Sequence, residues 1–338
     1  MVLEHLFPEN WLEKRASYAF ILAMVYSIIG IIGARLLFGA NSGIVSVVFT
    51  SILLLPYLEK LFAIEEKIEE KEKKFSLLHL WKDNKDLVKT YFAIFFGIFF
   101  TYMLFSFILP QLGFNTFNIF KEQLFLDPGL RGHAYDVGSF LSILSNNWWV
   151  LVACFLLALL TGDGAIFFIT WNASAWGTIF GYRAISAAWQ TGGNPWWFLF
   201  LIFIIVIWHV ILEAGAYIIV AISGSVISKD IISKASQIKK FAGYLLLGGG
   251  IIALLFYVMR QLGGLIYFIS SALIFVGALY AMKETFSDKK HKEVFTYNFW
   301  LFMIGLGVFV LGAFLEAGVL SWSGLLMRIY DASAMFMG

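Results

Sequence analysis

Long apolar runs, separated by polar or charged segments, dominate the hydrophobic pattern of this chain. Eight runs approach the length of about 20 residues that a helix needs to cross the hydrocarbon layer of a membrane, which is roughly 30 Å thick. They lie near residues 16–38, 42–58, 91–109, 164–182, 196–222, 242–259, 262–282 and 298–320. A ninth run, near 146–160, is shorter. The pattern predicts an all-α fold, a polytopic transmembrane helical bundle of about nine spans.

The short run is the fourth in chain order. Its 13 apolar residues, 148–160, would rise only about 20 Å as a helix. Two arrangements keep all later loops on their expected sides of the membrane. Either the helix spans together with residues 139–147, or residues 146–182 form a paired re-entrant hairpin.

Basic residues collect on one side of such a bundle. With a cytoplasmic N-terminus and nine crossings, eighteen of the 24 basic residues face the cytoplasm, namely Lys14, Arg15 and the lysines of 60–89, 229–240 and 283–292. The other side receives Lys121 and five arginines. This asymmetry follows the positive-inside rule. We therefore expect a multi-pass protein of the cell membrane with its C-terminus outside.

We expect residues 1–338 to form a single transmembrane domain with two extended loops. Residues 59–90 carry eight acidic and eight basic residues, some at the i,i+4 spacing that favours a solvated helix. This cytoplasmic helix either only links two spans or also docks a soluble or membrane partner. Residues 110–146 form the longest outer loop, which lies along the membrane surface or caps an external opening.

Composition narrows the function classes. The chain is 60% hydrophobic and 14% charged, against about 25% charged in an ordinary soluble domain, so its main partner is the lipid bilayer. The net charge is only +2, and the lysines and arginines are distributed by membrane topology, so we do not expect a nucleic-acid partner. The single cysteine, Cys154, excludes an intrachain disulfide and a cysteine-based metal site. Known catalytic and cofactor motifs are absent, so we predict neither an enzyme nor a bound cofactor or metal.

Ionisable residues inside the apolar runs are the candidate functional groups. An ionisable group at the centre of a bilayer costs roughly 2.5–3.5 kcal/mol on insertion scales. His209 and Glu213 are four residues apart, so a helix places them on one face within hydrogen-bonding reach. Such a pair either packs helices together or forms a proton or ion site.

Depth within the membrane suggests two groups of polar residues. Counted from Pro195 at 1.5 Å per residue, Glu213 lies roughly 27 Å along its helix, in the inner half. Asp163 is in a cytoplasmic turn, which predicts an inner cluster of Asp163, His209 and Glu213. Glu316 falls near the outer leaflet, where we expect it to form an ion pair with Arg35, Arg183 or Arg260. The remaining polar candidates are Asn146, Asn147 and Asn172.

Small residues predict where helices touch. Ala173, Gly177 and Gly181 have i, i+4, i+8 spacing, which gives one smooth helix face for a close neighbour or for self-association. The letters LEAG occur at 212–215 and again at 315–318, on spans predicted to run in opposite directions. Inverted repeats are a common feature of transporters.

Residues between 146 and 224 resemble the integral-membrane family of stage II sporulation protein M. The resemblance rests on the pair Asn146-Asn147, Gly162 and Gly164, Asn172 with Gly177, His209 with Glu213, and Glu316 in FLEAG. Trp208, Val210 and Ala173 depart from the family pattern, which has proline and glycine around the histidine and glycine after the asparagine. The resemblance implies a membrane scaffold or transport-like component.

We therefore predict a noncatalytic integral membrane protein of the sporulation protein M type, which acts as a scaffold or assembly component and forms homo-oligomers through its small-residue faces. The alternative is an ion- or proton-coupled transporter or channel with a polar cluster around Glu213. A third class, an intramembrane hydrolase using His209 and Glu213, lacks a nucleophile or third metal ligand fixed by spacing.

Overall fold

The computed structural model describes residues 16–39, 41–69, 77–125, 139–162, 165–232, 264–286 and 289–321, and within this part the protein is built from helices with no strand. The helices are α2 (Ala16–Phe38), α3 (Ser42–Glu69), α4 (Leu77–Gln111), α5 (Thr116–Ile119), α6 (Lys121–Leu124), α7 (Ser139–Thr161), α8 (Ala165–Thr191), α9 (Pro195–Ile232), α11 (Gly264–Met282) and α12 (Lys289–Ser321), with the 3-10 turn η2 (Lys283–Thr285) between the last two. The predicted all-α class is confirmed.

Six of these helices are long and apolar enough to cross a membrane: α2, α3, α4, α7, α9 and α12. Helix α8 is long enough but carries Asn172, Ser174 and Thr178 among its apolar residues. The apolar part of α11 is shorter, Ile266–Met282. The span predicted at 242–259 lies outside the described residues. These six helices are compatible with a multi-pass membrane protein, and the predicted count of about nine spans is not confirmed.

The fourth predicted span is one continuous helix. Helix α7 runs through Asn146 and Asn147 to Thr161, and its segment Ile143–Thr161 is long enough to cross a membrane. This fits the first of the two arrangements, in which residues 139–147 extend the short apolar run. In the charged segment 59–90, residues 59–69 continue α3 and residues 77–90 begin α4, while the residues between them lie outside the described part.

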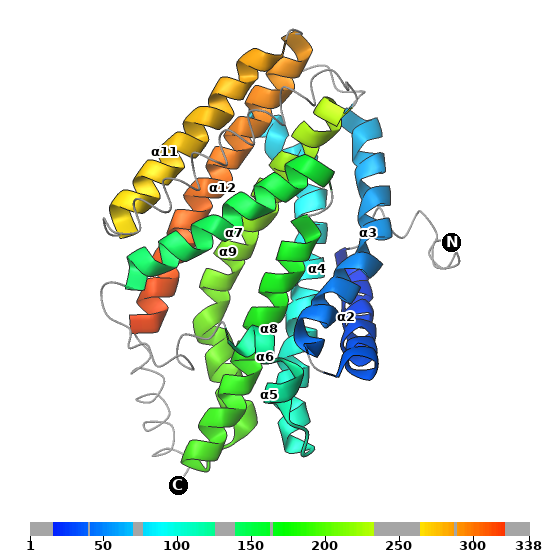
Figure 1. Cartoon of the computed structure of the whole chain (residues 1–338), viewed down its shortest axis with the longest axis vertical. Coiled ribbons are helices and arrows are strands. Elements are labelled where there is room, and N and C mark those ends of the chain that lie inside the picture. Colours follow the sequence, from blue (N-terminus) through cyan, green and yellow to red (C-terminus); the bar gives the residue numbers. More distant parts are fainter. Residues whose placement is uncertain are drawn as a thin grey trace.

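Helix α9 lies in the middle of the bundle, between α4 and α8 on one side and α7 and α12 on the other (Figure 1). Its 38 residues contribute to two separate hydrophobic cores. Val210, Ala214 and Ile218 pack with α2, α3, α4 and α8. Ala216, Tyr217 and Val220 pack with α7, α11 and α12. Any group on α9 between these two sets therefore lies at the junction of two halves of the molecule.

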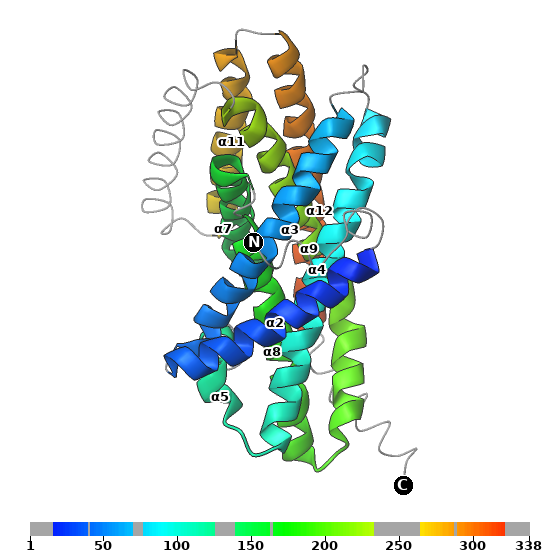
Figure 2. The same cartoon turned by 90° about the vertical axis from the view of Figure 1, so that its right-hand side faces the viewer.

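The charged connections lie at one end of the bundle. The end of α3, the start of α4, the end of α9 and the turn between α11 and α12 all lie toward the same end in two perpendicular views (Figure 1, Figure 2). Lys60, Lys85, Lys89, Lys283, Lys289 and Lys292 belong to these segments. We call this the lysine-rich end, and the α8–α9 turn lies at the opposite end.

The described part of the predicted outer loop packs against α3. Gln123 of α6 is buried and donates a hydrogen bond to the Gly43 carbonyl oxygen at 3.0 Å. Ser42 returns a bond to the Ile119 carbonyl oxygen at 3.0 Å. These contacts hold α5 and α6 against the first turn of α3, at the end opposite the lysine-rich end.

Candidate functional site

Three helices meet at the side chain of Asn147. Its Nδ2 on α7 donates to Glu213 Oε1 on α9 at 2.9 Å and to Glu316 Oε2 on α12 at 3.3 Å. Because both oxygens bond to one nitrogen, the two carboxyl groups are neighbours. We call Asn147, Glu213 and Glu316 the carboxyl triad.

A close helix crossing brings the two acids together. Helices α9 and α12 run in opposite directions side by side, and α7 crosses them (Figure 1). At Gly312 an added Cβ would lie 3.0 Å from Glu213 Cγ and 3.3 Å from Glu213 N. Because glycine has no side chain, α12 can approach α9 closely at Gly312, beside Glu213. Glu316 follows one helical turn later, on the same face of α12.

The triad brings two acidic groups together with no basic partner among the described residues. Glu213 is fully buried, whereas Glu316 is half-buried. Among the described residues, no lysine or arginine interacts with either carboxyl group. Two adjacent ionised carboxylates repel each other strongly in a medium of low dielectric constant. A hydrogen bond between two carboxyl groups also requires a proton on one of them, because an ionised carboxylate only accepts.

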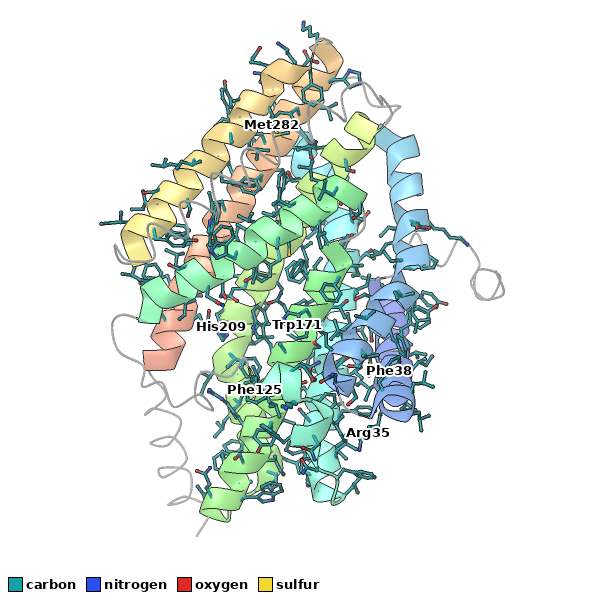
Figure 3. All side chains as sticks on the ribbon, in the orientation of Figure 1. Arg35, Phe38, Phe125, Trp171, His209 and Met282 are labelled. Carbon is teal, nitrogen blue, oxygen red and sulfur yellow. The ribbon has the colours of Figure 1, made fainter. Side chains whose placement is uncertain are left out.

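The predicted hydrogen bond between His209 and Glu213 is not formed. The His209 ring packs edge-on against Trp176 and Phe180 of α8, with centroids 6.5 and 6.3 Å away. Its Nδ1 is buried and has no hydrogen-bond partner within the described ranges. Figure 3 shows His209 on α9 at about the level of Trp171 on α8. The two side chains share a side of α9, but His209 faces aromatic residues on α8 while Glu213 faces the amide on α7.

The predicted ion pair between Glu316 and an outer arginine is not found among the described residues, and Arg260 lies outside them. Glu316 accepts from Asn147 instead, and the Arg35 side chain donates to the Gly39 carbonyl oxygen at 2.8 Å. The predicted depths placed Glu213 in the inner half and Glu316 near the outer leaflet, whereas both bond to Asn147. With 38 residues, α9 is about 57 Å long, and Glu213 lies near the middle of this helix.

The other predicted polar residues contribute unequally. Asn146 is exposed, and its Nδ2 donates to Asn147 Oδ1 at 3.1 Å, which orients the amide of the triad. Asn172 is buried on α8 and donates to the Phe168 carbonyl oxygen of its own helix at 2.8 Å. Asp163 lies outside the described residues.

The small-residue face of α8 lies against α4. A Cβ at Gly177 would meet the Phe99 carbonyl oxygen and lie 3.1 Å from Met103 N, and a Cβ at Gly181 would meet the Met103 carbonyl oxygen. Ala173, one turn earlier, is fully buried in the same core. These residues serve an interface inside the chain, so the face is not open to a second copy.

Tyr217 is a residue of this site that the sequence analysis missed. It is buried one turn beyond Glu213 on α9, and its hydroxyl has no hydrogen-bond partner in the part of the chain that the structure describes. The only signal in the sequence is the i+4 spacing from Glu213. Among the described residues, no group of three or more His, Cys, Asp or Glu side chains is arranged to hold a metal ion.

No protein family, curated protein or solved structure matches this chain. The resemblance to stage II sporulation protein M therefore stays a prediction from the residues that carry it.

Proposed function

We propose that this chain is an ion-coupled membrane transport protein whose carboxyl triad binds and releases a proton or a small monovalent cation. The observation that carries the proposal is the meeting of Glu213 and Glu316, from two helices, at the single amide donor of Asn147. Two acids that share a site without a basic partner can exchange a cation, because binding one relieves their repulsion.

The energetic cost supports a role in exchange. Each ionisable group near the middle of a bilayer costs roughly 2.5–3.5 kcal/mol on insertion scales, and such groups most often line ion or substrate pathways. Helices α4 and α8 also pack closely, at Gly177 and Gly181, through glycine and apolar side chains. Close packing in this bundle therefore does not require two acids. The repeated LEAG sequences at 212–215 and 315–318 lie on antiparallel helices, the relation found between inverted repeats of transporters.

A second candidate is a membrane scaffold of the sporulation protein M type. Its support is the burial of Glu213, together with the close approach of Gly312 to the Glu213 side chain. In that role the triad would lock α7, α9 and α12 in one arrangement, with both acids acting as hydrogen-bonding groups and no ion passing through the bundle.

Flux measurements in proteoliposomes separate the two candidates. Purified protein is reconstituted in vesicles that contain a dye sensitive to H⁺, Na⁺ or K⁺, and a gradient of the matching ion is applied in turn. For a transporter we expect flux above that of empty vesicles, lost in both Glu213→Gln and Glu316→Gln. Glu293→Gln is the matched control, because Glu293 is a half-exposed acid 3.9 Å from Lys289 on the same helix as Glu316.

Two results would contradict the transport proposal. One is wild-type flux no greater than that of empty vesicles for each of the three ions. The other is wild-type flux in both triad variants. The scaffold candidate predicts wild-type flux no greater than that of empty vesicles, together with lowered thermal stability in the triad variants.

A further inference from the structure

Two buried polar atoms without partners lie on successive turns of α9. Glu213 Oε2 and the Tyr217 hydroxyl are both fully enclosed, and neither makes a hydrogen bond within the described residues. A helix rises about 6 Å over the four residues between them. Buried polar groups are nearly always satisfied, so two orphans on one side of a helix, beside a pair of acids, need an explanation.

Few ionisable groups lie close to the Tyr217 side chain. Trp176 of α8 covers the ring, with centroids 6.4 Å apart. The ionisable groups that interact with it are Glu213 on its own helix, Cys154 on α7 and Glu316 on α12. His209 is on the far side of Glu213 along α9 and faces Trp176 and Phe180. Tyr217 therefore stands next to the triad, on the side toward the lysine-rich end.

The arrangement of the triad fits a proton better than a metal ion. The carboxyl groups of Glu213 and Glu316 accept from the same nitrogen, so they are neighbours, and one proton on the pair would relieve their repulsion. Asn147 turns its N–H group toward the pair, and its oxygen accepts from Asn146. A hard metal cation requires several oxygen atoms turned toward it.

We infer that the ion exchanged by the carboxyl triad is a proton, and that Tyr217 passes it toward the lysine-rich end. This inference rests on the proposed function and deepens it. In the step, the protonated carboxyl group of Glu213 gives its proton to a bridging water molecule, which gives a proton to the Tyr217 hydroxyl oxygen, while the hydroxyl gives its own proton to a second water molecule. The products are a Glu213 carboxylate, a neutral tyrosine and a hydronium ion, and the reverse step reloads the pair.

Infrared difference spectroscopy tests the bound proton without any need for transport. Wild-type protein in lipid vesicles is titrated with alkali, and the carboxylic acid C=O band is followed in H₂O and D₂O. We expect a deuterium-sensitive band that disappears as pH rises, that is missing in Glu213→Gln, and that is unchanged when choline replaces Na⁺. Absence of the band in the wild type, or a band that is lost when Na⁺ is added at constant pH, would overturn the inference.

The role of Tyr217 is tested by the rate of proton release after a pH jump. Tyr217→Phe removes only the hydroxyl and keeps the ring against Trp176. We expect the band to titrate over an unchanged pH range but proton release to slow by about 100-fold, the lower end of what a positioned proton-transfer group contributes. Tyr102→Phe is the control, because Tyr102 is equally buried but bonds to Ser46 Oγ at 2.8 Å in the other half.

Equal release rates in the two tyrosine variants would overturn the assignment of Tyr217, and thermal unfolding of both variants checks that each is folded. The inference and the proposed function can fail separately. A proton band without flux rejects transport and keeps the bound proton. Flux driven by Na⁺ and indifferent to pH keeps transport and rejects the proton.

Discussion

Two interfaces inside this bundle bring helices close together by different means. Between α4 and α8, Gly177 and Gly181 let one helix rest on the backbone of the other at Phe99 and Met103. Between α7, α9 and α12, the contact is arranged around Asn147 and two glutamates. The first interface relies on shape, and the second adds hydrogen bonds and acidic groups.

The difference shows that the acids are not needed for close packing. Lipid tails are as apolar as leucine, so helices in a membrane associate through van der Waals contact, small residues and some hydrogen bonds. Helices α9 and α12 already have two such close contacts, at Gly305 and Gly312. The carboxyl triad is placed at the second of these contacts, where it adds electrostatic cost to an interface that glycine has already closed. This cost argues for a use of the acids beyond adhesion.

The largest expected effect is at the interface between α4 and α8, which relies on shape. Gly177→Leu puts a side chain into the backbone of α4 at Phe99, so we expect a loss of about 3 kcal/mol or failure to fold, the upper end for overpacked sites. Thermal unfolding in detergent measures the loss. Gly307→Leu on α12 is the matched control, because a Cβ there meets nothing within 4 Å. Equal melting temperatures for the two variants would show that α4 and α8 are not in backbone contact.

A smaller effect is expected at the triad. Asn147→Leu removes the donor shared by Glu213 and Glu316, and a buried acceptor that loses its partner costs about 1–3 kcal/mol. Asn146→Leu is the control, since Asn146 is exposed and bonds only to Asn147 Oδ1, and we expect a change within about 0.5 kcal/mol. Unfolding of the double variant Asn147→Leu/Glu213→Leu sharpens the test. The cost of Asn147→Leu should shrink there, and an unchanged cost would mean that the amide and the acid do not interact.

Much of the helical architecture could be predicted from the sequence because apolar run length is a local property. The runs at 16–38, 42–58 and 91–109 correspond to helices that can cross a membrane. The full extent of α9 could not be predicted, because the helix continues past the apolar run at 196–222 to Ile232. The predicted depths separated Glu213 from Glu316, whereas both bond to Asn147.

The site was predicted as a list of residues and not as an arrangement. Ionisable residues in apolar runs identify Glu213 and Glu316 directly, since their cost is visible in the sequence. Their pairing depends on which helices touch, and the spacing of His209 and Glu213 carries no information about that. Tyr217 gave no signal because a tyrosine in an apolar run is ordinary, and only its orphan hydroxyl beside the acids makes it notable.

His209 offers a contrast with the triad inside the same helix. Its Nδ1 is buried without a partner, among aromatic rings, so His209→Phe replaces an unsatisfied group by an apolar one of similar shape. We expect the free energy of unfolding to stay unchanged or to rise by about 1 kcal/mol. His209→Ala, which leaves a cavity, should lower it. A loss in His209→Phe as large as that in Asn147→Leu would mean that the imidazole has a polar partner after all.

The smallest expected effect comes from an acid that does have a cation partner. Lys292 Nζ is 2.9 Å from a Glu284 carboxylate oxygen at the lysine-rich end, and this hydrogen bond and charge hold the pKa of Glu284 below its usual range. Because the pKa is depressed in the folded state, the stabilisation is present above the unfolded-state pKa and is lost as pH falls through the folded-state pKa. The pair is solvent-exposed, so the effect should be small and should fade in high salt. Thermal unfolding between neutral and acidic pH measures it, with Glu284→Gln as the variant that lacks the titration. A pH dependence that survives in Glu284→Gln would belong to other acids, and its persistence in high salt would point to the buried triad.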